Sequence, residues 1–213
     1  MKTITILNHK GGVGKTFAAV VLSQLLMIDG QRVAVVDTDA QLNAVDLLRT
    51  MEGGPVFAGV DVIASPLRVP DFGALQAAGY DSVIVDTPPN LTANETIQKV
   101  AAASDLFVVP FMLNRHSLFA VERTFELLPE GRPVLPVCSI SPAKTKDRAE
   151  MLALVRDQLG AAAGDVLAVV FLPMYARVES NLAARRDFFY RLTEREYSAF
   201  ERLRDAVRGA LEK

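Results

Sequence analysis

Runs of apolar residues recur along the chain, and stretches with the period of a helix lie between them. Most runs are continuous and rich in Val and Ile, which is typical of strands that helices cover on both faces of a sheet. Seven runs predict strands, at 3–7, 32–36, 60–63, 82–85, 106–109, 134–140 and 166–172. Helical periodicity is clearest at 16–28, 91–103, 117–128 and 148–159. This alternation predicts an α/β fold, a doubly wound and mostly parallel sheet of about seven strands, with ligands at the carboxyl ends of the strands.

Length and composition are those of a folded globular protein. The chain has 213 residues, of which 50% are hydrophobic and 23% charged, and an open α/β sheet of this size commonly forms one domain. No linker rich in Ser, Gly or Pro divides the chain, and we find no internal repeat. We therefore expect a single domain over residues 1–213. Because the first predicted strand starts by residue 3, we expect no helix-turn-helix module before it.

Charge and hydropathy narrow the functional classes. The net charge of −2, from 23 basic and 25 acidic residues, excludes a generally basic nucleic-acid-binding protein but leaves room for a local basic patch. The apolar stretch 17–28 is interrupted by Ser23 and Gln24 and is too short to span a bilayer. Cys138, the single cysteine, lies in an apolar run and predicts a buried, reduced thiol. We expect a cytoplasmic protein with no membrane partner.

A glycine-rich segment follows the first predicted strand and leads directly into the first predicted helix. Glycines let backbone N–H groups curl around phosphate oxygens without a clashing Cβ. Lys15 can reach the β- and γ-phosphates, and the Thr16 hydroxyl can hold Mg²⁺. The segment therefore predicts a phosphate-binding loop made of Lys10, Gly11, Gly12, Val13, Gly14, Lys15, Thr16 and Phe17.

Acidic residues follow two further predicted strands. Asp37 and Asp39 come directly after 32–36, and Asp86 directly follows the apolar strand 82–85. In an extended segment Asp37 and Asp39 would point the same way, so that one supports the magnesium shell and the other orients the attacking water. Asp86 is placed to hold Mg²⁺ through water, because this ion keeps most of its hydration shell. We predict Thr16, Asp37 and Asp86 as the residues around the metal.

The loop departs from the general phosphate-loop pattern, because His9 stands where the first glycine is expected and Lys10 precedes the glycines. In this it resembles the deviant Walker A loop, KGGxGK followed by Ser or Thr, of the ParA/MinD family of ATPases. The segment 37–41 is similar to that family's D-x-D-P-Q motif, with Ala40 in place of proline, and 87–89 resembles its switch segment. We interpret His9 as a hydrogen-bonding loop residue and not as a catalytic base. The resemblance covers the first 130 residues well and the rest loosely.

The resemblance implies a mechanism and residue roles. ATP and Mg²⁺ would be the cofactors, and a partner would stimulate a slow hydrolysis of ATP to ADP and phosphate. Lys10 would cross the interface of an ATP-dependent homodimer to touch the phosphates bound by the other subunit, while Lys15 serves those of its own. Asp39 would activate the attacking water. Pro173, at the end of the last predicted strand, would lie beside the adenine.

The family's small ParA-type DNA partition ATPases are the most similar in motif. This implies non-specific DNA binding, association with the nucleoid in the ATP-bound form, and a small DNA-binding adaptor of ParB type. The cargo would be a plasmid or a chromosomal segment. Arg185, Arg186 and Arg191 flank the aromatic residues 188–190, which predicts either a nucleic-acid surface or core aromatics beside solvated arginines.

Two other functions stay open. One is a MinD-like, membrane-associated positioning ATPase, although the predicted helix 194–211 mixes acids and bases on its polar face, which favours docking on the sheet. The other is a metabolic synthetase on the same scaffold, of the dethiobiotin or cobyrinate type. Iron–sulfur carrier relatives are excluded because cluster ligation draws on several cysteines.

Overall fold

Seven parallel strands form the centre of the structure, a computed structural model that describes residues 1–50, 59–89, 95–112, 115–141, 169–173, 176–186 and 188–212. The strands are β1 (Lys2–Ile6), β2 (Val33–Asp37), β3 (Val60–Ala64), β4 (Ser82–Asp86), β5 (Leu106–Phe111), β6 (Val134–Ser141) and β7 (Val170–Pro173). Their order is β3-β2-β4-β1-β5-β6-β7, and every adjacent pair is parallel. The first strand of the sequence is therefore the middle strand of the sheet.

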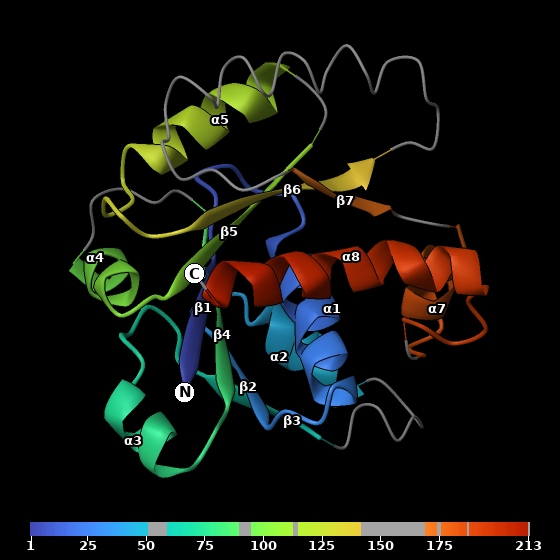
Figure 1. The fold of residues 1–213 in the computed structure, drawn as a ribbon, viewed down its shortest axis with the longest axis horizontal. Coiled ribbons are helices and arrows are strands. Elements are labelled where there is room, and N and C mark those ends of the chain that lie inside the picture. Colours follow the sequence, from blue (N-terminus) through green and yellow to red (C-terminus); the bar gives the residue numbers. More distant parts are fainter. Residues whose placement is uncertain are drawn as a thin grey trace.

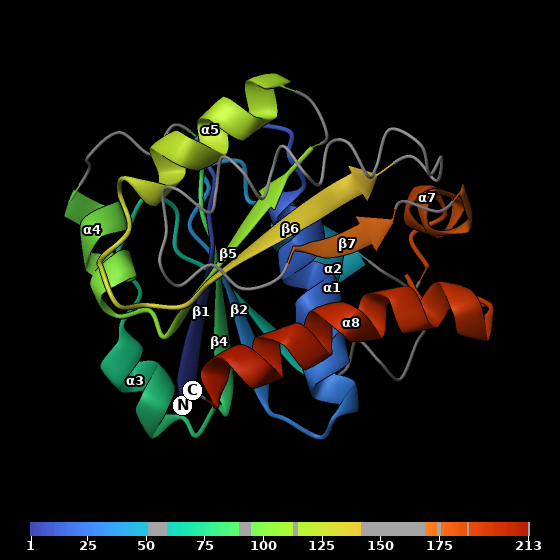
Figure 2. The ribbon, with the colours of Figure 1, turned by 45° about the horizontal axis from the view of Figure 1, so that its top comes forward.

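Helices cover both faces of this sheet (Figures 1 and 2). They are α1 (Lys15–Ile28), α2 (Asn43–Thr50), α3 (Phe72–Ala77), α4 (Glu95–Ala102), α5 (Arg115–Phe125), α7 (Ala176–Ala183) and α8 (Glu194–Leu211). Helices α1, α2 and α8 pack on one face, and α3, α4 and α5 pack on the other. The predicted doubly wound α/β fold is confirmed.

The predicted strands and helices match the structure where it describes them. All seven strands are present, although 166–168, before β7, lies outside the described residues. The predicted helix 148–159 and the start of the helix predicted from residue 91 also lie outside them. Helices α2, α3 and α7 were not predicted, because six to eight residues give too few turns for a clear period. The Asp71 side chain accepts the backbone N–H of Ala74 at 2.9 Å and so begins α3.

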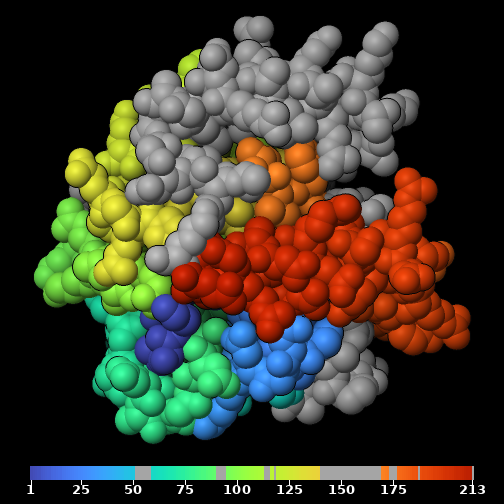
Figure 3. All heavy atoms as spheres, in the orientation of Figure 1, coloured from blue at the N-terminus to red at the C-terminus, as the bar shows by residue number. Residues whose placement is uncertain are grey.

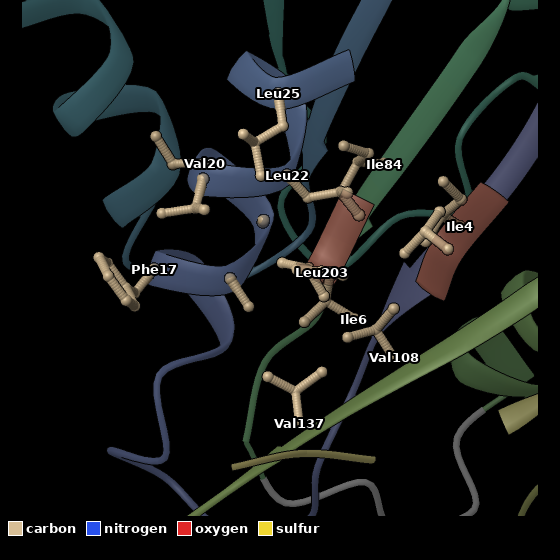
Figure 4. Packing of buried hydrophobic residues seen from close by; sticks show 14 of the residues in the cluster. Ile4, Ile6, Phe17, Val20, Leu22, Leu25, Ile84, Val108, Val137 and Leu203 are labelled. Carbon is tan, nitrogen blue, oxygen red and sulfur yellow. The ribbon is translucent and has the colours of Figure 1, made fainter. Parts of the chain in front are cut away.

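Helix α1 is buried along most of its length because apolar residues occur on all its sides. It packs on the sheet beside α8, which also contacts β5, β6 and β7 and runs across the face of the molecule seen in Figure 3. Figure 4 shows this core, in which α1 contributes Phe17, Val20, Leu22 and Leu25, the strands contribute Ile4, Ile6, Ile84, Val108 and Val137, and α8 contributes Leu203. The phosphate-loop helix is thus fixed inside the molecule.

Helix α8 docks on the sheet side of the molecule as its amphipathic pattern predicts. Thr193 and Glu196 form a capping box at its start, and Phe200, Leu203 and Val207 are fully buried. Near its other end Arg204 lies 3.4 Å from Asp29, the residue that ends α1. Within the described residues no helix is both long and apolar enough to cross a bilayer. Cys138 is buried in β6, as predicted.

Candidate nucleotide-binding site

A cavity of about 400 Å³ opens at the carboxyl ends of the central strands, where this fold class binds ligands. It is large enough for a nucleotide's phosphate chain, since small-molecule sites begin at roughly 300 Å³. Its walls come from the glycine loop, from the segment after β2 and from the segment after β4. The lining residues are Gly11, Gly12, Gly14, Lys15, Thr16, Asp39, Gln41, Asn43 and Pro89.

The glycine loop takes a backbone path that side chains disfavour. Gly12 and Gly14 have φ angles of 71° and 89°, in the left-handed region that glycine enters without a steric penalty. Gly14 is also the N-cap of α1, and its carbonyl accepts the N–H of Ala18 at 2.9 Å. The N–H groups of the first turn precede that first helical bond, so they have no helical acceptor. A helix start of this kind favours phosphate oxygens.

Lys15 places its ammonium group inside the loop. The residue is only 7% exposed, and its Nζ donates to the carbonyl oxygens of Lys10 at 3.1 Å and Asn8 at 3.3 Å. Burial lowers the pKa of this lysine, since desolvation penalises its charged form. A cation held by loop carbonyls beside the cavity is positioned to exchange them for phosphate oxygens.

Thr16 lines the cavity, and the buried Asp86 is bonded to it. The Thr16 hydroxyl donates to Oδ2 of Asp86 at 2.8 Å, while Oδ1 of Asp86 is buried without a hydrogen-bond partner. Burial raises the pKa of Asp86 to about 7. A buried, unpaired carboxylate oxygen beside a hydroxyl fits Mg²⁺, which prefers oxygen ligands and takes only one or two from the protein when phosphates are bound. No group of three or more potential His, Cys, Asp or Glu metal ligands forms among the described residues.

Asp37 has a different role from the one predicted. It is fully buried, and its Oδ2 accepts the N–H groups of Ala44 at 2.9 Å and Val45 at 3.2 Å, at the start of α2. Its Oδ1 accepts the N–H of Asp39 at 3.1 Å. The expectation that Asp37 and Asp39 point the same way is wrong, because β2 ends at Asp37 and the chain turns there. With both oxygens bound to backbone amides, Asp37 caps a helix, and we leave it out of the proposed metal site.

Asp39 lines the cavity, and Lys10 directly precedes Gly11, the first glycine of its lining. Asp39 is half-buried, lines the cavity, and accepts the N–H of Gln41 on its Oδ1 at 3.0 Å. Lys10 is half-buried at the base of the loop, and in the part of the chain that the structure describes its ammonium group makes no ion pair. The predicted water-activating residue and the predicted bridging lysine are therefore both accessible.

Two other predicted residues, Phe17 and Val13, contribute less than expected through their side chains, and the place of Pro173 beside the base is not tested. Phe17 is 8% exposed and packs edge-to-face on Phe188, with ring centroids 5.6 Å apart, so only its backbone N–H can serve a nucleotide. Val13 is buried, and its carbonyl accepts a hydrogen bond from the Ser139 hydroxyl. Pro173 ends β7 at the edge of the sheet. The segments 142–168 and 174–175 on either side of this strand lie outside the described residues, so a base pocket at Pro173 stays a prediction.

The structure adds loop-supporting residues that the sequence did not indicate. Asn8 is fully buried and binds the carbonyl of Pro110, 102 positions away in the sequence. His9 does hydrogen-bond, but through its backbone N–H, which Thr124 accepts at 3.1 Å, whereas its Nδ1 is buried without a partner. No local pattern could reveal these contacts, because each partner belongs to a distant element.

The segment around residues 185–191 contains both a core aromatic residue and an exposed basic and aromatic surface, the two alternatives that its sequence predicts. Phe188 is buried in the core, whereas Tyr190 is 40% exposed. The guanidinium groups of Arg186 and Arg191 lie over the Tyr190 ring, 5.5 and 5.0 Å from its centroid. Arg185 is exposed beside them. A small basic and aromatic surface, made of Arg185, Arg186, Tyr190 and Arg191, therefore stands on a buried phenylalanine.

Comparisons with known proteins agree with this geometry. Residues 1–53, which contain the loop, match a family model described as an AAA domain. The chromosome-partitioning ATPase Soj of Thermus thermophilus is 29% identical over 211 residues, which cover 84% of this chain and 83% of that protein.

Two solved structures share the fold at low sequence identity. The MinD cell division protein of Aquifex aeolicus superposes with a TM-score of 0.74 at 17% identity, over 100% of this chain and 98% of that one. The ParA of pNOB8 bound to nonspecific DNA gives 0.62 at 23% identity, over 78% of each chain. With a complete deviant loop, a similar partition ATPase along most of its length and the matching parallel sheet, the chain is similar in sequence and fold to the ParA/MinD family of P-loop ATPases.

Proposed function

We propose that this protein is a ParA-type switch, in which ATP and Mg²⁺ drive dimerisation and slow hydrolysis reverses it. The dimer would bind DNA without sequence preference and partition or position plasmid or chromosomal DNA. One observation carries the proposal: the loop holds two lysines in different states. Lys15 is buried in the loop and bound to its carbonyls, whereas Lys10 is half-buried and its ammonium group has no ion pair within the described chain.

The proposed ATPase activity rests on the cavity. The backbone cradle and Lys15 would bind the phosphates, and Thr16 and Asp86 would hold the magnesium ion. When bound, Mg²⁺ would neutralise part of the phosphate charge and favour its transfer to water. Asp39 lines the same cavity as the glycine loop and Thr16 and would orient the water.

The proposed ATP-dependent dimerisation rests on Lys10. A lysine that already serves its own phosphates leaves a second cation free for those of another subunit. In a symmetric pair each such contact occurs twice, so a modest interaction gains weight. ADP offers one phosphate fewer to this bridge. We therefore propose that the dimer forms with ATP and not with ADP.

The proposed DNA binding rests on the basic and aromatic surface at Tyr190. Arginine contacts to phosphates give affinity without sequence preference, and an exposed ring can stack on a base. A relative of this fold, the ParA of pNOB8, has been solved bound to nonspecific DNA. Because the whole chain carries a net charge of −2, one copy offers a small footprint, and the dimer would double it.

We propose that a small DNA-binding adaptor of ParB type stimulates hydrolysis, and that the protein is cytoplasmic and bound to the nucleoid in its ATP form. A MinD-like membrane role is the main alternative, given the fold shared with MinD. Helix α8 offers little to a membrane, because Phe200, Leu203 and Val207 on its apolar face are already buried.

Light scattering with a slowly hydrolysed ATP analogue tests the proposal. The parent protein should double its mass with the analogue and Mg²⁺ but stay monomeric with ADP. Lys10→Ala should bind the analogue with near-normal affinity and remain monomeric. A Lys10→Ala protein that dimerises like the parent would show that the lysine acts within its own subunit. Sedimentation with liposomes, and turnover with dethiobiotin or cobyrinate precursors, separate the two alternatives.

A further inference from the structure

Both polar atoms of the Asn8 side chain form hydrogen bonds at the base of the glycine loop. The residue is 0% exposed. Its Nδ2 donates to the carbonyl of Pro110 at 2.7 Å, and its Oδ1 accepts the N–H of Lys10 at 2.8 Å. A carbonyl only accepts and an N–H only donates, so these two partners fix the orientation of the amide. Asn8 thus joins Lys10 to the end of β5.

Other side chains hold other parts of the loop. The Ser139 hydroxyl, from β6, donates to the carbonyl of Val13, and Asp86, from β4, accepts from Thr16. Among the hydrogen bonds of the described residues, two side chains contact the backbone of Lys10: the amide of Asn8 and the ammonium group of Lys15. The loop is therefore supported at separate points by separate strands, and β5 supports the point that carries Lys10.

Lys10 is held from two directions in the nucleotide-free protein. Its N–H is bound by Asn8, and its carbonyl accepts from Nζ of Lys15 at 3.1 Å. When Lys15 turns to phosphate oxygens, the second hold is lost. Both hydrogen bonds of the Asn8 amide are made to the protein without any phosphate, so the first hold persists.

We propose that Asn8 is a positioning residue for Lys10, which keeps that lysine directed away from its own loop and toward a second subunit in the ATP-bound protein. This rests on the proposed ATP-dependent dimer. It separates two properties of one loop: ATP affinity follows the cradle and Lys15, and dimerisation follows the direction of Lys10.

Asn8→Ala is the direct test, with Ser139→Ala as its matched control. Both substitutions remove a buried side chain that supports the loop, but only the first touches Lys10. Asn8→Ala should need about tenfold more protein for half-maximal dimerisation with the ATP analogue, the factor expected for the loss of one ordinary hydrogen bond. Its ATP affinity by calorimetry should stay within about threefold of the parent value. Ser139→Ala should not show this split.

Asn8→Ser covers the case in which Asn8→Ala does not fold. A serine hydroxyl can accept an N–H two residues along the chain, but it is too short to reach Pro110. This variant should dimerise less well than the parent and better than Asn8→Ala. Thermal unfolding of all three variants identifies those that are folded at the assay temperature.

The outcomes are distinguishable. If Lys10→Ala dimerises like the parent, the proposed dimer mechanism is overturned. A different result would be that Lys10→Ala loses dimerisation while the folded Asn8 variant, Asn8→Ala or Asn8→Ser, still dimerises like the parent. That result would overturn only the assignment of Asn8. An equal loss of ATP affinity and dimerisation, or an equal effect of Ser139→Ala, would also overturn it, because either result describes general support of the loop.

Discussion

Asp86→Asn should remove a specific pH dependence from the stability of the nucleotide-free protein. Burial raises the pKa of Asp86 from its usual value of 3.8 to about 7, and unfolding returns the carboxyl to water. Between these two values the folded protein keeps a proton that the unfolded chain has released. The free energy of unfolding therefore falls as pH rises through this window, and the contribution is flat above pH 7.

The size of the effect follows from the shift. Between pH 5 and the folded pKa, a range of about two pH units, the free energy of unfolding falls by about 1.4 kcal/mol for each unit. From pH 5 to pH 8 Asp86 alone therefore lowers the free energy of unfolding of the parent protein by about 3 kcal/mol. Burial also raises the pKa of Asp37, but that residue is present in both proteins. Comparing two pH values within each protein removes any constant cost of the asparagine.

Urea unfolding at pH 5 and pH 8, with a chelator and no nucleotide, measures this difference. The parent should lose about 3 kcal/mol more than Asp86→Asn over this range. Asp46→Asn, which changes an exposed acid on α2, should follow the parent. Parallel losses in the parent and Asp86→Asn would refute the account of Asp86 as a buried, unpaired acid.

Four further substitutions test the site. Lys15→Ala should weaken ATP binding at least about 100-fold by calorimetry, because the phosphates lose a cation in a cradle of low dielectric; unchanged affinity would remove the loop from the site. Asp39→Ala should keep ATP binding and dimerisation but lower turnover about 100-fold or more in a phosphate-release assay, since water is oriented only in the transition state. Arg186→Ala with Arg191→Ala should weaken DNA retention at equal ATP affinity and make its salt dependence shallower; equal DNA binding with and without ATP would argue against the switch. Asp37→Ala should lower the free energy of unfolding by about 2 kcal/mol, as expected for a lost helix cap, and a smaller loss than for an exposed acid would contradict the capping role.

Strands and the phosphate loop could be predicted because their signals are local. Each strand is a continuous apolar run, and the loop's glycines, Lys15 and Thr16 begin after only three further residues from the end of the first run. The position of Asp86 beside Thr16 followed from the rule that parallel strands end at the same edge of a sheet. The pairing of β1 with β4 confirms that step, since Ile6 and Asp86 are partners in register.

The role of Asp37 could not be predicted in the same way. Its partners are backbone amides seven and eight residues later, and α2, which supplies them, has too few turns to show a period. Local extension from β2 suggested the wrong direction for the side chain. Asn8 was missed for a different reason: its partner Pro110 is adjacent only after β1 and β5 have paired. Long-range backbone acceptors leave no mark in a sequence.

The central place of β1 sets a time order for synthesis. This strand and the loop after it are made before their neighbours β4 and β5, which end at Asp86 and Phe111. At about 5 to 20 residues per second, translation reaches the end of β5 roughly 5 to 20 s after it has passed β1. Until then the glycine loop lacks the strands that hold Asn8 and Thr16. A nascent chain therefore carries its nucleotide motif before the strands that complete the site exist, and during that interval both edges of β1 are open to pairing with other chains.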